Sequence, residues 1–244
     1  MQVLRLSLVG LFAATSLIAS AQPASVGSDE TGLPFFSCFA MRDIGGGGQN
    51  WEFLQDERGL LYVANNFGVL EYDGASWRLI QTPLRNVVRS LALDGSGRIY
   101  AGSFGEIGYL DPNSEGVLDF ISLDRLLDEP YRDFTDVWTI QVMSESIYFQ
   151  SRERLIRMTP RVPNAGPNRE DWDVKVWEPK ETILWTFDVG GELWLHQRGL
   201  GLSRMVDDSL EFVAGTEVFA NDRVQVMLPL ASRGEDAHVF IGFT

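Results

Sequence analysis

The fold is decided by residues 49–80, which read QNWEFLQDERGLLYVANNFGVLEYDGASWRLI. Apolar and polar residues alternate in short runs, and the runs are separated by polar turns with a glycine, at residues 56–59, 65–68 and 73–74. Such turns between alternating runs are the strongest short-range signal for antiparallel hairpins. We therefore predict an antiparallel meander with strands at residues 51–55, 60–64, 69–72 and 76–80.

The same order of runs and turns returns along the rest of the chain, in residues 88–111, 138–158, 184–204 and from 224 to the end. The second run of each copy carries an aromatic residue, and these are 38, 48, 46 and 46 positions apart: Tyr62, Tyr100, Tyr148, Trp194 and Phe240. A period of about 45 residues with four short strands per unit is typical of β-propeller blades. The alternative, a β-sandwich whose turns coincide by chance, is disfavoured by this regularity.

The predicted fold is an all-β propeller with four blades of about 45 residues and part of a fifth. A closed ring of seven such blades needs roughly 315 residues, so we expect further blades in a longer chain. The predicted divisions are a signal peptide at 1–21, a lead-in segment at 22–48 and the incomplete propeller at 49–244. Between the second and third blades, residues 118–134 fit either a short helix or an outer strand followed by a long loop.

The first 21 residues have the features of a secretory signal peptide. One basic residue, Arg5, precedes an apolar run at 6–19, and small residues at 19–21 form a cleavage site. The apolar run is shorter than the about 20 residues that a membrane-spanning helix requires. We therefore expect the mature protein to be exported, to the periplasm or beyond. Cys38 is the only cysteine, which excludes a disulfide within these 244 residues, and its phenylalanine neighbours predict a buried thiol.

Composition indicates a globular domain. Apolar residues make up 45% of the chain and aromatic residues 11%, which is enough for a hydrophobic core. Acidic residues outnumber basic ones by 34 to 20, and this excess argues against binding to nucleic acid or to anionic membrane surfaces. Many of the acidic residues stand in predicted turns, where they are most simply explained as solvated turn formers.

No group of residues in the sequence has the spacing of a catalytic or metal site. The two histidines, His196 and His238, belong to the second strands of their blades, and no cluster of further ligands accompanies them. Nucleophile-elbow, phosphate-loop and calcium-loop patterns are absent. We therefore predict no catalytic residue, no metal and no cofactor for this chain. A secreted propeller enzyme, lactonase-like or lyase-like and acting on a polar small molecule or carbohydrate, is the alternative.

The expected ligand-binding face follows from the course of the chain in a propeller blade. The first strand is innermost, and its entry end shares a face with the loop between the second and third strands. The Asp-x-x-Gly turns lie on the opposite face. The loop face offers amide, hydroxyl, guanidinium and aromatic groups, which suit a polar ligand such as a sugar or an acidic metabolite. The predicted ligand-binding residues are Asn65, Asn66, Arg89, Ser103, Glu106, Gln150, Arg152, His196 and Arg198.

Motifs in the first three repeats carry a resemblance to a known family. The clearest are Gln49-Asn50-Trp51, Asn65-Asn66-x-Gly68 and Asp73-Gly74-x-x-Trp77 in the first repeat, Val88-Arg89-Ser90-Leu91 in the second, and Asp136-Val137-Trp138 in the third. They resemble the blades of the two-component regulator propeller family. The similarity covers essentially residues 35–243 and is weaker beyond the third repeat, where the Asp-x-x-Gly turn is replaced by Asp188-Val189-Gly190-Gly191.

The resemblance implies a function in signal transduction. In that family the propeller is the periplasmic sensor of a one-pass receptor, and a β-sandwich and one membrane helix follow it. The output domain is a histidine kinase, a nucleotide cyclase or a helix-turn-helix regulator, and none of these lies in this chain. The chain itself is then a non-catalytic module that recognises a small polar ligand, a carbohydrate or a periplasmic protein. Its contact with the membrane would come only through the downstream helix, and a homodimer of the full receptor is left open, as is a purely structural scaffold.

Overall fold

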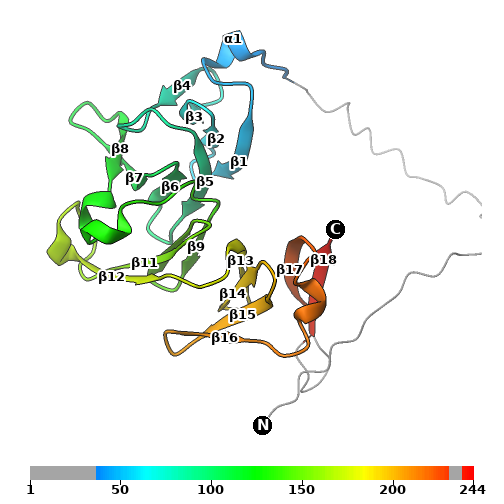
Figure 1. Ribbon diagram of the computed structural model, residues 1–244. Coiled ribbons are helices and arrows are strands. Elements are labelled where there is room, and N and C mark those ends of the chain that lie inside the picture. Colours follow the sequence, from blue (N-terminus) through cyan, green and yellow to red (C-terminus); the bar gives the residue numbers. More distant parts are fainter. Residues whose placement is uncertain (1–36, 231–237) are drawn as a thin grey trace, which may run out of the picture. The chain divides into compact units, whose positions relative to one another are not determined.

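The predicted meander folds as one antiparallel sheet of four strands. The strands are β1 (Asn50–Gln55), β2 (Leu61–Asn65), β3 (Gly68–Tyr72) and β4 (Trp77–Ile80), hydrogen-bonded in that order. This computed structural model describes residues 37–230 and 238–244 (Figure 1). The predicted signal peptide at 1–21 lies outside the described residues.

Three further segments of the chain form sheets of the same kind, with strands in sequence order outward from the first strand (Figure 1). The second sheet contains β5 (Val88–Leu93), β6 (Ile99–Ser103), β7 (Ile107–Pro112) and β8 (Leu118–Ser122). The third contains β9 (Thr139–Met143), β10 (Ser146–Gln150), β11 (Leu155–Pro160) and β12 (Trp172–Trp177). The fourth contains β13 (Ile183–Val189), β14 (Glu192–Gln197), β15 (Gly201–Val206) and β16 (Ser209–Phe212), and a last pair is β17 (Val224–Leu230) with β18 (His238–Phe243).

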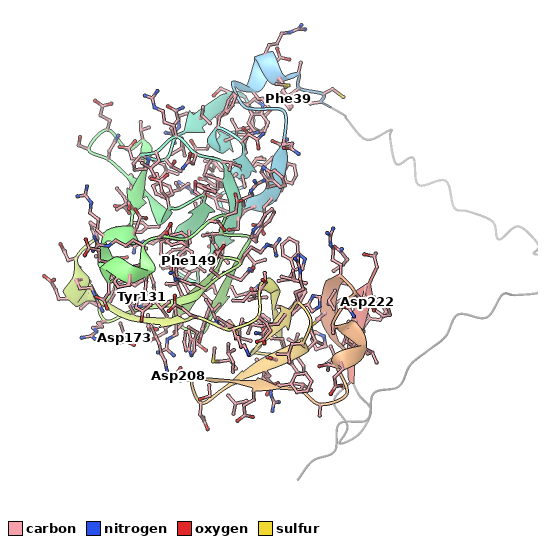
Figure 2. All side chains as sticks on the ribbon, in the orientation of Figure 1. Phe39, Tyr131, Phe149, Asp173, Asp208 and Asp222 are labelled. Atoms are coloured by element: carbon pink, nitrogen blue, oxygen red, sulfur yellow. The ribbon has the colours of Figure 1, made fainter. Side chains whose placement is uncertain are left out.

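Consecutive sheets touch through their first strands: β1 contacts β5, β5 contacts β9, β9 contacts β13, and β13 contacts β17. Each sheet is therefore a propeller blade with its first strand innermost, as the sequence predicts. The hydrophobic core lies between neighbouring blades. Between blades two and three, for example, Phe149, which is labelled in Figure 2, lies in this core. Its ring meets that of Tyr100 edge to face, with ring centroids 6.2 Å apart.

Strand pairing confirms the equivalence of the five repeated aromatic residues. Each pairs with a residue near the middle of the first strand of its own blade: Tyr62 with Leu54, Tyr100 with Ala92, Tyr148 with Gln141, Trp194 with Phe187 and Phe240 with Leu228. The same register therefore recurs in all five repeats. This recurrence allows any position in one blade to be compared with the same position in the next.

The polar turns of the first two blades close by the same hydrogen bonds. The Asp56 carboxylate accepts the backbone N–H groups of Arg58 and Leu60, at 2.9 and 3.0 Å. Asp94 accepts those of Ser96 and Arg98 in the same way, at 2.9 Å each. Aspartate at the first position of a turn satisfies backbone donors that would otherwise be left unpaired. These acidic residues thus act as turn formers, as expected.

Gly68 explains the Asn-Asn-x-Gly motif that precedes β3. Its φ is +139°, and a Cβ at this position would stand 2.2 Å from the carbonyl oxygen of Ile80. Only glycine allows the backbone of β3 to start this close to the end of β4.

The outer strands and the lead-in segment agree with the expectations at one point and differ from them at two. Residues 118–134 form the outer strand β8 followed by the short 3₁₀ turns η1 (Asp124–Leu126) and η2 (Glu129–Tyr131), so the second alternative is right. The outer strand β16 was not predicted, because Ser209–Phe212 is short and mostly exposed. The prediction of a buried Cys38 thiol is wrong, since Cys38 is exposed and so is its neighbour Phe39.

The chain divides into two compact units, residues 1–39 and 40–244. Residues 37–39, the described part of the first unit, form neither helix nor strand. In the second unit, the one-turn helix α1 (Met41–Ile44) leads into the glycine run before β1. Gly46 and Gly47 are buried there, and a Cβ on either would stand 2.8 Å from side-chain atoms of Leu70 or Asn66. The run is a loop packed against blade one.

Candidate functional site

The inner strands of blades one, two and four and of the last pair have a β-bulge at their entry ends. The pairing register shifts at Trp51 in blade one, Arg89 in blade two, Leu184 in blade four and Gln225 in the last pair. A bulge redirects its side chain away from the regular alternation of the strand. In blade three the corresponding residue is Trp138, which directly precedes the regularly paired strand β9 and whose backbone N–H donates to the Gln150 carbonyl at 2.8 Å.

Arg89 lies between the two tryptophans. Its guanidinium carbon is 3.9 Å from the Trp51 ring centroid and 4.8 Å from that of Trp138. The Nε atom donates to the Asp136 carboxylate at 2.7 Å, and each side chain of this ion pair is 17% exposed. Stacking on indole and pairing with a carboxylate together compensate a cation that has lost most of its water.

Arg152 continues the arrangement into blade four. It comes from the loop between β10 and β11, and its guanidinium carbon is 4.5 Å from the Trp138 ring centroid and 5.6 Å from that of Trp185. One terminal nitrogen donates to the Ile183 carbonyl at 3.2 Å and also to the Leu184 carbonyl. No ion pair joins Arg152 to a carboxylate of the described residues. Burial, and next the charges of Arg198 and Arg223, lower its pKa.

Together these five side chains form one continuous row across four blades. We call Trp51, Arg89, Trp138, Arg152 and Trp185 the tryptophan–arginine ladder. The tryptophans meet edge to face, with centroids 6.2 Å apart for Trp51 and Trp138 and 6.0 Å for Trp138 and Trp185. Contact with indole rings restricts each guanidinium, and the N–H groups that the protein does not use remain free to donate to a ligand. The ladder therefore presents hydrogen-bond donors held between aromatic rings.

The loop residue four positions after the repeated aromatic residue is equivalent in the four complete blades. It is Asn66 in blade one, Phe104 in blade two, Arg152 in blade three and Arg198 in blade four. Asn66 joins the ladder, because its side-chain oxygen accepts the Trp51 indole N–H at 2.9 Å. Arg198 and Phe104 are exposed. The structure thus brings together the predicted residues Asn66, Arg89, Arg152 and Arg198 on one face.

The other predicted residues are buried and bonded to backbone. Asn65 binds the lead-in segment, accepting from the Gly47 N–H at 2.7 Å and donating to the Gly47 carbonyl at 3.0 Å. Ser103 donates to the Val87 carbonyl at 2.8 Å. Gln150 donates to the Ser151 carbonyl at 2.6 Å. These partners account for the polar side chains without a ligand, so contact of these three residues with a ligand stays a prediction.

Two buried ionisable groups stand on the same side of the blades. Glu106 accepts the Leu84 N–H at 3.2 Å, and burial raises the pKa of its carboxyl group. His196 has its Nε2 atom 3.0 Å from the Phe219 carbonyl, which makes Nε2 the donor, while Nδ1 is buried without a partner. Burial lowers the pKa of His196. Both residues are less than a tenth exposed, so their contact with a ligand also stays a prediction.

Sequence reasoning missed the three tryptophans of the ladder. A signal for one of them was present, since Trp51 stands 11 residues before Tyr62, as Arg89 stands 11 residues before Tyr100. Trp138 stands 10 residues before Tyr148 and Trp185 nine before Trp194, and only the packing in the structure connects these two tryptophans to the others.

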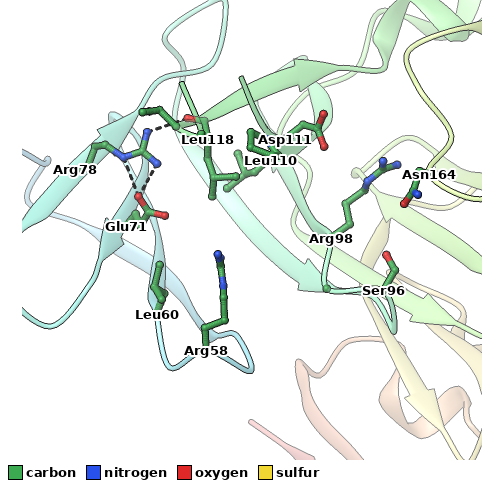
Figure 3. A pocket seen from close by; sticks show the side chains of 14 residues that line it. Arg58, Leu60, Glu71, Arg78, Ser96, Arg98, Leu110, Asp111, Leu118 and Asn164 are labelled. Carbon is green, nitrogen blue, oxygen red and sulfur yellow. Dashed lines mark hydrogen bonds and ion pairs between the residues drawn. The ribbon is translucent and has the colours of Figure 1, made fainter. Parts of the chain in front are cut away.

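Two cavities lie on the opposite, turn-bearing face. The first, of about 490 Å³, lies between blades one and two, where Arg78 donates to Glu71 and to the Leu118 carbonyl (Figure 3). The second, of about 520 Å³, lies between blades two and three. Arg98 lines both, stacks on Tyr109 at 4.2 Å and donates to the Ala165 carbonyl at 2.7 Å. The arginines of these cavities are thus engaged by the protein itself.

Within residues 37–230 and 238–244, no three histidine, cysteine or acidic side chains converge as a metal site would require. Over the same residues no helix has the length and apolarity needed to cross a membrane.

Comparison with solved structures identifies the fold. The extracellular domain of a putative hybrid two-component system from B. thetaiotaomicron superposes with a TM-score of 0.55 at 17% identity, over 80% of this chain and 25% of that chain. Virginiamycin B lyase from Staphylococcus aureus superposes with a TM-score of 0.53 at 12% identity, over 82% of this chain and 64% of that chain. The fold is that of a β-propeller. At these identities the likeness establishes the fold, and at that level the resemblance predicted from the motifs is confirmed.

A third similar structure is PorZ, a surface component of the type-IX secretion system of Porphyromonas gingivalis, with a TM-score of 0.52 at 10% identity, over 79% of this chain and 30% of that chain. The chain therefore spans about a quarter of the extracellular domain of the two-component system, a little under two thirds of the lyase and under a third of PorZ. No protein-family model matches the sequence, and neither does any curated protein.

Proposed function

We propose that the chain belongs to the ligand-sensing propeller of an exported signalling receptor. The observation that carries the proposal is the tryptophan–arginine ladder, which places oriented guanidinium donors on the face that the sequence predicts for ligand binding. The propellers of similar fold include extracellular domains of receptor systems, which supports the same reading. The ligand is a small polar molecule, a carbohydrate or a periplasmic protein, and an output domain in the remainder of the receptor responds to it.

The face of the blades that carries the tryptophan–arginine ladder, which we call the ladder face, has a chemistry that favours binding over catalysis. A catalytic acid or base must reach the reacting group of the substrate. Asp136 is held by Arg89 at 2.7 Å, and the His196 imidazole is buried against the Phe219 carbonyl. The side chains that the ladder offers are guanidinium and indole groups, which bind and orient a ligand but exchange no proton near neutral pH. The proposed module is therefore non-catalytic, and the receptor's output enzyme, a histidine kinase or cyclase, would lie elsewhere.

The location follows from the same proposal. The signal peptide predicted at 1–21 would direct export of the chain to the periplasm. There the propeller would be exposed to ligands that enter from outside the cell. The protein would then be attached to the membrane only by a helix downstream of the propeller, and its partners would not include nucleic acid.

One experiment separates a sensor from an enzyme. The full-length protein is incubated with a panel of sugars, oligosaccharides and organic acids, and its thermal unfolding is recorded together with the chemical state of each compound. A sensor is stabilised by a ligand that is recovered unchanged, by about 2.7 kcal/mol at a concentration one hundred times the dissociation constant. Turnover of many equivalents of any compound, abolished by ladder substitutions, would contradict the proposal.

A secreted lyase is the second candidate, because the chain superposes on virginiamycin B lyase over 82% of its residues. In the same panel a lyase would release product with an elimination-derived double bond. Such a product, formed catalytically by the wild-type protein, would replace the sensor proposal with this one.

A further inference from the structure

We propose that the ladder face binds an oxyanion, a carboxylate or a sulfate group of the sensed ligand, between Arg152 and the neighbouring Arg198 and Arg223. This inference rests on the proposed function and names the chemistry of its ligand. The first observation is one of charge. The chain carries a formal net charge of −14, yet three arginines gather here on blades three, four and the last pair, and none forms an ion pair within the described residues.

The repeat of the blades places these arginines near one another. Arg152 and Arg198 occupy the same loop position in successive blades, and Arg223 directly precedes β17, the inner strand of the next repeat. The backbone fixes each of them. The Ile183 N–H donates to the Arg152 carbonyl at 3.0 Å, the Arg198 N–H to the Thr182 carbonyl at 2.9 Å, and the Arg223 N–H to the Thr244 carbonyl at 3.0 Å. The three cations therefore stand on an ordered framework before any ligand binds.

Arg152 lies close enough to the other two arginines to be affected by their charges. Burial is the main cause that lowers its pKa, and the charges of Arg198 and Arg223 lower it further, while Asp136 and Glu153 oppose them. Asp136 is paired with Arg89 at 2.7 Å, and Glu153 accepts the Thr135 hydroxyl at 3.0 Å. A bound anion would relieve this repulsion, because an opposite charge at a half-buried guanidinium is screened less than one in open water.

The orientation of Arg152 selects a planar or tetrahedral oxyanion over a simple polar group. One terminal nitrogen is used by the Ile183 and Leu184 carbonyls, and the guanidinium carbon lies 4.5 Å from the Trp138 ring centroid and 5.6 Å from that of Trp185. Its Nε and second terminal nitrogen make no hydrogen bond within the described residues, and these two donors match the two oxygens of a carboxylate or sulfate. Arg198, which is exposed, would approach the same anion from the next blade.

The test uses intrinsic tryptophan fluorescence of the full-length protein, because Trp138 and Trp185 flank Arg152. Three probes are titrated: a galacturonic acid oligomer, which carries carboxylates, dextran sulfate, and neutral dextran. We expect one of the two anionic probes to bind, weakening as salt is raised, and neutral dextran not to bind. Which anion binds identifies the group as carboxylate or sulfate. Binding of neutral dextran with equal affinity, or of neither anion, would overturn the proposal.

Substitutions locate the anion. Arg152→Ala is expected to weaken binding about tenfold or more, since a hydrogen-bonded charge is lost, and Arg198→Ala about threefold. Arg152→Lys should restore only part of the affinity, because an ammonium cannot donate two parallel bonds. The matched control is Arg204→Ala in blade four, whose guanidinium is 3.0 Å from Glu192, and it should leave binding unchanged. If Arg152→Ala fails to fold, the exposed Arg198 decides the outcome.

The two proposals fail differently. Equal affinity of the wild type, Arg152→Ala and Arg198→Ala for an anion would remove the oxyanion site and leave the sensor function standing. Catalytic conversion of the bound probe would remove the sensor function, whether or not binding depends on Arg152.

Discussion

Arg89 and Arg152 occupy neighbouring steps of the same ladder but differ in how their charge is compensated. Both stack on Trp138, at 4.8 and 4.5 Å. Arg89 has a second stacking partner at 3.9 Å and a carboxylate at 2.7 Å, so its charge is satisfied inside the protein. Arg152 has backbone carbonyls and a more distant indole, with two further arginines nearby. The first arginine holds blades together, whereas the second still has capacity for an anion.

Because these two arginines differ in their partners, residue type alone does not distinguish a structural arginine from a ligand-binding one. Both residues were predicted as ligand contacts from their place on the loop face. A cation that is mostly buried and already paired contributes chiefly to stability. A half-buried cation without a carboxylate gains from an external one. The contrast lies between two halves of the ladder face: the first half surrounds Arg89, on blades one and two, and the second half surrounds Arg152, on blades three and four.

Removing the carboxylate of the first half should have the largest effect. Asp136→Ala would leave the Arg89 guanidinium unpaired while 17% exposed, and breaking one partner of a buried pair is strongly destabilising. We expect a loss of about 3 kcal/mol in the free energy of unfolding. Urea denaturation of the full-length protein, followed by the fluorescence of the ladder tryptophans, measures it.

Asp208→Ala is the matched control. Asp208 lies in the turn between β15 and β16 and pairs with Arg157 and Lys175, but it is 42% exposed (Figure 2). Exposed pairs contribute about 0–1 kcal/mol. Equal losses in the two variants would show that Arg89 is no better compensated than a surface arginine and would remove the contrast.

Acid should destabilise the second half through His196, which lies two residues before Arg198. Burial lowers its pKa, against the opposing influence of the Phe219 carbonyl and Asp222. Its folded pKa is thus below the 6.5 of the unfolded state, so the unfolded chain binds more protons as the pH falls. The free energy of unfolding should decrease as the pH drops below about 6.5. His196→Gln, which keeps a donor for the Phe219 carbonyl, should flatten this decrease.

Glu106 in blade two provides the control of opposite sign. Burial raises the pKa of its carboxyl group above 4.5, so here the folded state binds more protons and stability falls as the pH rises through the folded pKa. Glu106→Gln should remove that trend and leave the His196 trend intact. Unfolding curves recorded at several pH values distinguish the two, and an unchanged slope in His196→Gln would contradict the assignment.

The sequence predicts the blades well because their signals are local. Tyr62 and Tyr100 occupy the same register, and the Asp56 and Asp94 turns close by the same bonds, since hairpins are encoded within a few residues. The ladder is a different case. Trp51 and Trp138 meet at 6.2 Å only because the fold brings the entry ends of inner strands from different blades together.

The sequence pattern also did not predict which of the loop side chains are buried. Asn65 and Gln150 are polar residues in predicted loops, which favours a ligand contact, yet the structure buries both against backbone groups. Asn65 is satisfied by the lead-in segment, and Gln150 donates to the neighbouring Ser151 carbonyl and also to the Ile183 carbonyl of the next blade, at 3.3 Å. Gly47 and Ile183 are distant in sequence from these residues, so a local pattern cannot reveal whether the polar side chain is already engaged.

Adding charge to the first half should have the smallest effect. Phe104 occupies the loop position of Arg152 and Arg198, is 46% exposed and is joined to Asp136 by a backbone bridge. Phe104→Arg would extend the row of arginines by one blade, but the neighbouring Asp136 carboxylate would neutralise part of the new charge. We therefore expect the affinity for the anionic probe to rise only about two- to threefold, consistent with an exposed charge, and Phe104→Gln to leave it unchanged. A rise as large as the loss in Arg152→Ala would mean that overall charge, and not the held geometry of Arg152, governs binding at this face.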